Sequence, residues 1–181
     1  MPGTDNSLLG AKVALRIKHL PGGPVKVLDA FGGYGVVWQE VAAQTKRTDI
    51  YRVGIDKEKR LGCVHGDNRK WLKGMTLSLF DVIDLDAYGM PFDQIEILFK
   101  RKFKGVVFFT FIQAGLRQVV GKLLRANGIT KEMEKKCDTL FGQIGWQLWL
   151  DYLANNGVKK VFWMGGNFQR ASKHYGCFVL T

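Results

Sequence analysis

Short apolar runs alternate along the chain with longer segments whose apolar residues recur every three or four positions. The short runs predict strands and the longer segments predict helices, because these periods match the side-chain spacing of each element. The predicted strands cover residues 25–30, 51–55, 63–65, 79–85, 105–111, 158–164 and 175–180, and the predicted helices cover residues 6–20, 36–44, 94–99, 116–124 and 131–155.

This alternation predicts an α/β fold in a single domain, residues 1–181. Helices between successive strands make right-handed crossovers, which build a doubly wound, mostly parallel, seven-stranded sheet with helices on both faces. The last two strands are joined by only about ten residues, 165–174, without a helical stripe. The last strand is therefore expected to run antiparallel. In such a sheet, ligands bind outside the carboxyl ends of the strands.

The net charge of the chain indicates what class of partner it binds. A net charge of +11 and a pI near 9.7 favour nucleic acid, although a merely solvated basic surface gives the same numbers. No apolar run reaches the length of a membrane span, and the first residues lack the features of a signal peptide. Three widely spaced cysteines predict free thiols, a cytoplasmic location and no structural zinc site.

A glycine turn, DAFGGYG, follows the first predicted strand at residues 29–35. A dinucleotide fingerprint would need a third glycine where Trp38 stands, and a P-loop would need Gly-Lys-Ser/Thr. Asp29 at the mouth of the turn would repel a phosphate but attract a cation. The pattern therefore favours a positively charged ligand lying against the backbone N–H groups, with a plain strand–helix turn as the alternative.

The turn resembles the D-x-F-x-G-x-G signature of class I S-adenosylmethionine-dependent methyltransferases, and three later landmarks follow in the same order. The resemblance implies S-adenosylmethionine as cofactor, bound by residues 25–91, with a C-terminal half at 92–181. Asp56 would hold the ribose hydroxyls and Asp67 the adenine amine, while capping of turns or helices is the alternative for both. The residues that the resemblance assigns to the cofactor are Asp29, Phe31, Gly33, Gly35, Asp56, Lys57, Asp67 and Asn68.

The fourth predicted strand ends in DLDAYG, which we interpret as the methyl-acceptor site. Strand alternation puts Asp84 and Asp86 on one face, where they can bind an amine or amide, and Tyr88 can stack on a base. The stretch is similar to the D-x-D-P-Y/F-G segment of tRNA guanine-N2 dimethyltransferases and more loosely to the D/N-P-P-Y/F motif of amino-N methyltransferases, with Ala87 replacing the proline. The resemblance implies catalytic roles for Asp84, Asp86 and Tyr88; one acid capping a turn and the other being solvated is the alternative.

Basic residues near this edge of the sheet are candidates for nucleic-acid contacts. We expect phosphate contacts from Lys12, Arg16, Arg170 and Lys173. The basic cluster at residues 100–104 is expected at the opposite edge, where it is a solvated face or a contact in a homo-oligomer.

These observations together predict a methyltransferase that acts on a base nitrogen of RNA, such as a tRNA, or of DNA. Two alternatives stay open: a methyltransferase for protein or a small molecule, and a non-catalytic nucleic-acid-binding module with the same fold.

Overall fold

The computed structural model describes residues 8–113, 117–137, 139–168 and 171–181. Within them, the strands form one seven-stranded sheet in the order β3-β2-β1-β4-β5-β7-β6. Strands β1 to β5 pair in parallel, and β7 is antiparallel to both β5 and β6, as predicted. The strands are β1 (Val25–Asp29), β2 (Ile50–Asp56), β3 (Cys63–His65), β4 (Val82–Leu85), β5 (Gly105–Ile112), β6 (Val161–Phe168) and β7 (Ala171–Leu180).

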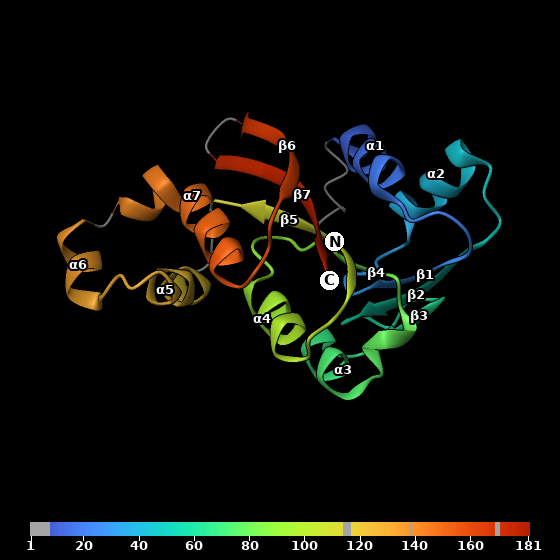
Figure 1. Cartoon of the computed structure of the whole chain (residues 1–181), viewed down its shortest axis with the longest axis horizontal. Helices are drawn as coiled ribbons and strands as arrows, with labels where there is room; N and C mark the ends of the chain where they lie inside the picture. The colour runs from blue at the N-terminus through green and yellow to red at the C-terminus, as the bar shows by residue number, and fades with distance from the viewer. Residues whose placement is uncertain (1–7, 114–116, 138, 169–170) are drawn as a thin grey trace.

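Helices cover both faces of the sheet, which confirms the predicted layers (Figure 1). α1 and α2 pack on one face, while α3, α4, α5 and α7 contribute to the core on the other. None of the helices in the described ranges is long and apolar enough to cross a membrane. The helices are α1 (Leu9–His19), α2 (Val36–Thr45), α3 (Asn68–Gly74), α4 (Phe92–Lys100), α5 (Arg117–Ala126), α6 (Lys131–Lys136) and α7 (Leu140–Asn155), with a short 3-10 helix, η1 (Leu77–Leu79).

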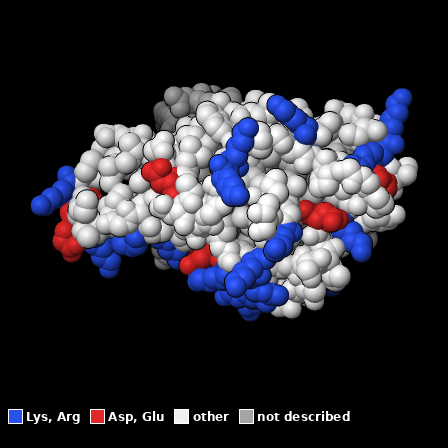
Figure 2. Space-filling model, viewed as in Figure 1, with Lys and Arg blue, Asp and Glu red and all other residues white. Residues whose placement is uncertain are grey.

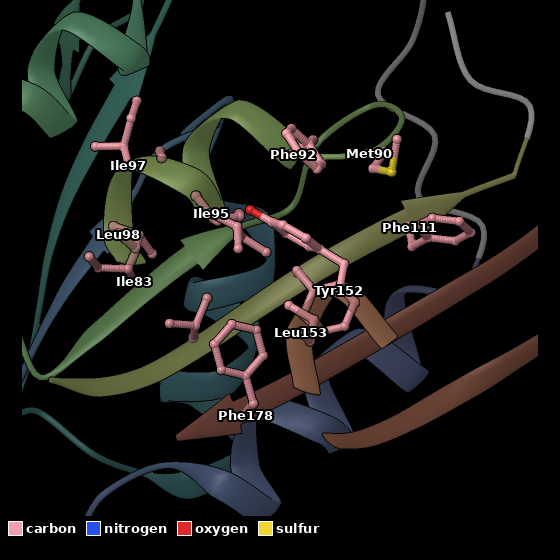
Figure 3. Close-up of a cluster of buried hydrophobic side chains, with 14 of the residues drawn as sticks. Ile83, Met90, Phe92, Ile95, Ile97, Leu98, Phe111, Tyr152, Leu153 and Phe178 are labelled. Carbon is pink, nitrogen blue, oxygen red and sulfur yellow. The ribbon is translucent and has the colours of Figure 1, made fainter. Parts of the chain in front are cut away.

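The larger core lies between the sheet and the helices α4 and α7 (Figure 3). Tyr152 of α7 stacks on Phe92 of α4 with ring centroids 4.7 Å apart, and Phe178 of β7 packs in the same cluster. Each such fully buried side chain contributes about 1.5–3 kcal/mol of hydrophobic stabilisation. This packing fixes β4 and β5, whose carboxyl ends carry candidate site residues.

The long helix predicted over residues 131–155 is two helices, α6 and α7. The chain leaves the helical region at Cys137, where φ is −141° and ψ is 82°. The apolar stripe predicted from Met133 onward does not reach the core, since Met133 is exposed and α6 has no buried residue. Leu140, Phe141, Leu148 and Tyr152 of α7 pack in or against the core, whereas Ile144 is exposed. The predicted helix at 131–136 is thus present, but the buried face is confined to α7.

The region predicted as a loop at residues 165–174 is mostly paired strand. β6 and β7 form a hairpin whose register runs from Val161 opposite Phe178 to Phe168 opposite Ala171. Gly165 lies inside this ladder with a φ of 154°, and a Cβ on it would lie 2.3 Å from the carbonyl oxygen of Lys173. The lack of a side chain at Gly165 thus permits a close approach of two strands.

The remaining differences lie at the ends of elements. β4 starts at Val82, because residues 77–79 form the 3-10 helix η1 and not strand. The described part of α1 begins at Leu9, and residues 6 and 7 of the predicted helix lie outside the described residues, as does residue 116 of the helix predicted at 116–124.

Candidate active site

A cavity of about 600 Å³ opens at the carboxyl ends of β1, β2, β4 and β5. The glycine turn after β1 forms one wall, and the segment after β4, with Asp86, Ala87 and Tyr88, forms another. Lys12 of α1 and Lys173 of β7 complete the lining. The volume falls within the range of small-molecule sites, and the location is the one that a doubly wound sheet offers to ligands.

The glycine turn is built around an arginine. Gly33 and Gly35 have φ values of 48° and 71°, which glycine adopts at little cost. The guanidinium of Arg52, from β2, donates to the carbonyl oxygen of Gly32 and lies so close to the turn that a Cβ on Gly35 would be 2.7 Å from its Nη1 atom. The glycines therefore leave room for the Arg52 side chain and also permit the positive φ values of the turn.

Asp29 lines the cavity, but its charge already has a partner. Its carboxylate accepts a hydrogen bond from Nε of Arg52 at 2.9 Å and one from the backbone N–H of Phe31 at 3.3 Å. Burial, followed by the neighbouring carboxylate of Asp84, raises the pKa of Asp29 to about 7, against the lowering effects of Arg52 and Arg16. A cationic ligand would thus meet a buried carboxyl group whose ionisation is incomplete at neutral pH.

Asp56, at the end of β2, also lines the cavity and has hydrogen-bonding capacity left. Two backbone N–H groups donate to it, from Gly33 at 3.0 Å and from Glu58 at 2.8 Å. Nε of Arg60 lies 3.0 Å from the same carboxylate, and the Arg60 guanidinium lies over the Tyr34 ring at 4.5 Å. A carboxylate has about four lone-pair positions. The two backbone N–H groups occupy two of them, and Nε of Arg60 makes no hydrogen bond within the described residues, so Asp56 can still accept from a pair of hydroxyls.

Three residues that the resemblance assigned to the cofactor do not line the cavity. Lys57 is exposed to solvent. Asp67 caps α3 by accepting from the backbone N–H of Arg69 at 2.9 Å, and hydrogen bonds from the Arg69 side chain are the main cause that lowers the pKa of Asp67 to about 2. Asn68 is buried and donates to the carbonyl oxygen of Ala30 at 2.7 Å. The capping alternative therefore describes Asp67 in this structure.

Asp84 and Asp86 lie on one face of the strand end, as alternation predicted, but both are committed to internal partners. Arg16 donates to both carboxylate oxygens of Asp84, at 2.8 and 2.7 Å, and the indole N–H of Trp38 donates at 2.7 Å. Asp84 is almost wholly buried, so these bonds leave it little access to a substrate.

Asp86 is held by Lys12, whose Nζ lies 2.7 Å from Oδ2, and by the hydroxyl of Thr110. Burial favours its neutral form, but the charges of Arg16 and Lys12 outweigh burial and lower the pKa of Asp86 below its ordinary value. The predicted conflict between two adjacent acids is thus relieved by cations. Asp86 stays ionised and keeps lone pairs that can accept from a ligand.

The predicted nucleic-acid contacts need correction at Arg16. Its side chain is 2% exposed and is engaged by Asp84, so it cannot reach a phosphate. Lys12 and Lys173 are also buried, but both line the cavity, with their Nζ atoms 5.1 and 5.5 Å from the centre of the Tyr175 ring. Arg170 lies outside the described residues. The basic cluster at residues 100–104 lies between α4 and β5, at the amino-terminal edge, as predicted.

Sequence reasoning missed Arg52, Trp38 and Thr110 as parts of the site. The sequence did hold a signal for Arg52. A charged side chain in the middle of a strand with neighbours on both sides needs an oppositely charged residue on the same face of the sheet. In the parallel register, Asp29 stands opposite Gly54, two positions from Arg52. In the sequence, Trp38 is informative only because it stands where a dinucleotide fingerprint needs glycine. Its hydrogen bond to Asp84 joins residues that are 46 positions apart in the chain, so no local pattern predicts it.

Comparisons with known proteins agree on the fold. A scan against models of protein families found no match, and a search among curated proteins found no similar sequence. Among solved structures, a Listeria monocytogenes protein assigned to the class I S-adenosylmethionine-dependent methyltransferases is similar over 98% of this chain and 60% of its own, with 15% identity and a TM-score of 0.58.

Two further structures have the same arrangement. Trm1 from Pyrococcus horikoshii, solved with S-adenosyl-L-methionine, matches 94% of this chain and 54% of its own, with 13% identity and a TM-score of 0.50. The precorrin-6y C5,15-methyltransferase from Geobacter metallireducens matches 96% of this chain and 87% of its own, with 10% identity and a TM-score of 0.52. The chain thus spans little more than half the length of the first two, and it has the Rossmann-like fold of the class I S-adenosylmethionine-dependent methyltransferases.

Proposed function

We propose that the chain is a methyltransferase that uses S-adenosylmethionine to modify a base nitrogen of RNA, such as a tRNA, or of DNA. The observation that carries the proposal is the shared cavity, in which the glycine turn with Asp29 and Asp56 faces the acceptor segment with Asp86 and Tyr88. A donor on one wall and an acceptor on the other would meet within a single pocket. Methyl transfer depends mainly on such alignment and on the exclusion of water.

The residues present fit this cofactor. When bound, S-adenosylmethionine supplies an electrophilic methyl group on a positively charged sulfur. Asp29 offers a buried carboxyl group beside the glycine turn, whose ionised form a cationic donor would favour, and Asp56 offers lone pairs for a pair of hydroxyls. The turn lets a ligand approach the backbone closely, because the positions of positive φ carry no side chain.

On the acceptor side, the chain offers a hydrogen-bond acceptor and a ring. Asp86 can accept from an exocyclic N–H and so orient the nitrogen lone pair towards the donor. Tyr88 is 91% exposed at the mouth of the cavity, where its ring can stack on a base that has left its helix. The charge of +11 supports a polyanionic substrate, and three free cysteines support a cytoplasmic location.

The proposal is tested by incubating the protein with S-adenosylmethionine labelled in the methyl group and, in turn, with total RNA, DNA and protein. We expect label in RNA or DNA, removed by nuclease and retained after protease. Label only in protein or in a small-molecule extract would refute the nucleic-acid substrate. Digestion of the labelled nucleic acid to nucleosides, followed by mass spectrometry, would identify the base.

A second candidate is a non-catalytic module that binds the cofactor or nucleic acid. One observation favours it: both acceptor carboxylates are paired with cations of the chain itself, and Ala87 stands where the resembling motif has proline. This candidate predicts saturable binding of S-adenosylmethionine without transfer to any of the three pools. The same labelling experiment, combined with calorimetry of cofactor binding, decides between the two.

A further inference from the structure

The end of the sheet formed by β2 and β3 leaves aromatic and apolar side chains exposed on the face that carries α3. Tyr51 and Val53 of β2 alternate with the half-buried Ile50 and Arg52. They lie on the face of Ile55, and Val64 of β3 stands opposite Ile55. Tyr51 is 58% exposed, and both valines are also exposed. Ile55 and Leu72 of α3 belong to the same buried cluster, whereas Tyr51, Val53 and Val64 stay exposed.

Trp71 of α3 extends this exposed row towards the cavity. Its indole is 40% exposed and donates to the carbonyl oxygen of His65 at 3.4 Å. A Cβ on Gly66 would lie 2.8 Å from its Nε1 atom, so the ring lies directly against the backbone. The N–H of Gly66 donates to the carbonyl oxygen of Asp56, and Asp56 lines the cavity. The row from Tyr51 to Trp71 therefore leads along the strands to the candidate active site.

Lysines border the same row. Lys26 stands opposite Tyr51 in the register of β1 and β2, and Lys70 precedes Trp71 on α3; both lysines are exposed. Figure 2 shows Lys and Arg side chains gathered over α3 and the end of α4. The nearby acid Asp67 is paired with Arg69 at 2.7 Å. The exposed carboxylate of Asp81 accepts from the backbone N–H of Lys26 at 2.8 Å and adds one negative charge, so the two lysines leave this surface with a net positive charge.

We propose that this surface, the β2–α3 surface of Tyr51, Val53, Val64, Trp71, Lys26 and Lys70, binds single-stranded nucleic acid and guides it to the cavity. Bases stack on the two rings, and the lysines contact phosphates, which is how sequence-tolerant single-strand sites are built. The inference rests on the proposed function, since it names the form of the substrate and its path.

The composition of the surface favours nucleic acid over a second copy of the chain. Protein–protein interfaces are depleted in lysine, whereas lysines beside an edge strand discourage pairing between sheets. Exposed rings flanked by lysines suit a polyanion with stacked bases. β3 has only three residues, which is a short edge for strand addition.

The first test measures binding of a fluorescein-labelled 12-nucleotide single-stranded RNA by anisotropy. Tyr51→Thr keeps a strand-forming residue and Trp71→Leu keeps a helix-forming one, but each removes a ring. We expect each to weaken binding about fivefold to hundredfold, whereas Tyr51→Phe and Trp71→Phe keep a ring and stay within about threefold of the original protein. Circular dichroism melts confirm that every variant is folded, because the wild-type side chains are exposed.

The second test isolates the lysines. Lys26→Gln with Lys70→Gln should reduce the slope of log affinity against log salt by about 1.4, or about 0.7 for each lost contact with a single strand. Lys135→Gln with Lys136→Gln is the matched control, because α6 carries these lysines at the other end of the molecule (Figure 1). The control should keep the original slope.

The outcomes separate this inference from the proposed function. If the protein methylates RNA or DNA but the ring and lysine variants bind as tightly as the original, the β2–α3 surface is overturned and the proposed function stands. If the original protein neither binds nor methylates nucleic acid, both fall. A dimer that Tyr51→Thr converts to monomer, without a change in RNA affinity, would identify the surface as a protein interface and overturn the inference.

Discussion

The raised pKa of Asp29 makes cofactor binding depend on pH in a direction that can be measured. The group faces Arg52 from β2, Asp84 from β4 and Arg16 from α1, and burial raises its pKa to about 7. The cationic donor favours the ionised carboxylate. Binding should therefore remove a proton from Asp29 wherever that proton is present in the free protein.

The size of the effect follows from the pKa. With a value of about 7, roughly one-eleventh of the molecules carry an ionised Asp29 at pH 6, and roughly ten-elevenths carry one at pH 8. If only the ionised form binds the donor, affinity rises about tenfold over this range, or by about 1.4 kcal/mol. Above about pH 8 the affinity should level off, because ionisation is then nearly complete.

The ligand-free protein should show the opposite trend in stability. The pKa of Asp29 in the folded state is above its ordinary value of 3.8. Between about pH 4 and pH 7 the native state thus holds more protons at this group than the unfolded state, so its contribution to the free energy of unfolding falls as pH rises. Saturating cofactor should reduce this loss, since the ligand favours the ionised form.

Isothermal titration calorimetry with S-adenosylmethionine at pH 6, 7 and 8 checks the prediction. Measurements in two buffers of different ionisation enthalpy give the number of protons released, which should approach one at pH 6. Asp29→Asn is the control, because it keeps the size of the side chain and should bind with an affinity that is lower and independent of pH. An affinity of the original protein that is flat from pH 6 to pH 8, without proton release, would refute the reasoning.

Three further predictions concern single contacts. Arg16→Met leaves Asp84 buried without its cation and should lower the free energy of unfolding by about 3–5 kcal/mol, measured by urea titration; a loss below about 1 kcal/mol would contradict the buried ion pair. Gly35→Ala places a Cβ against Arg52 at positive φ and should weaken cofactor affinity at least tenfold, whereas Gly10→Ala, with open space around it, should leave affinity unchanged. Tyr88→Ala should lower methyl transfer about fivefold to hundredfold at an unchanged melting temperature, with Tyr88→Phe close to the original; equal loss in both would argue against stacking.

The succession of strands and helices along the chain, and their arrangement in layers, could be predicted from the sequence because each element carries its own signal. The turn of Gly33 and Gly35, the apolar run before it and the helix after it are local patterns, and the structure confirms each of them. The hairpin at residues 165–174 was missed for a related reason: glycine is a local signal for a break, yet its use at Gly165 is set by a neighbouring strand.

The partners of the charged residues could not be predicted in the same way. Arg16 and Asp84 are 68 positions apart, and Lys12 and Asp86 are 74 apart. A basic residue on an amphipathic helix normally faces solvent, so the pattern of α1 gave no indication that its basic side chains enter the sheet edge. Only the packing of α1 against the carboxyl end of β4 brings these charges together.

The internal pairing of these residues changes where attraction to a polyanion can originate. Arg52, Arg16 and Lys12 are each matched by an acid of the cavity region, Asp29, Asp84 and Asp86. With the three acids ionised, each pair contributes no net charge, so these pairs do not account for the excess of +11. That excess belongs to side chains outside these pairs, such as the exposed lysines of the β2–α3 surface. Long-range attraction should therefore act on the flank of the sheet, while the cavity selects by hydrogen bonding and shape.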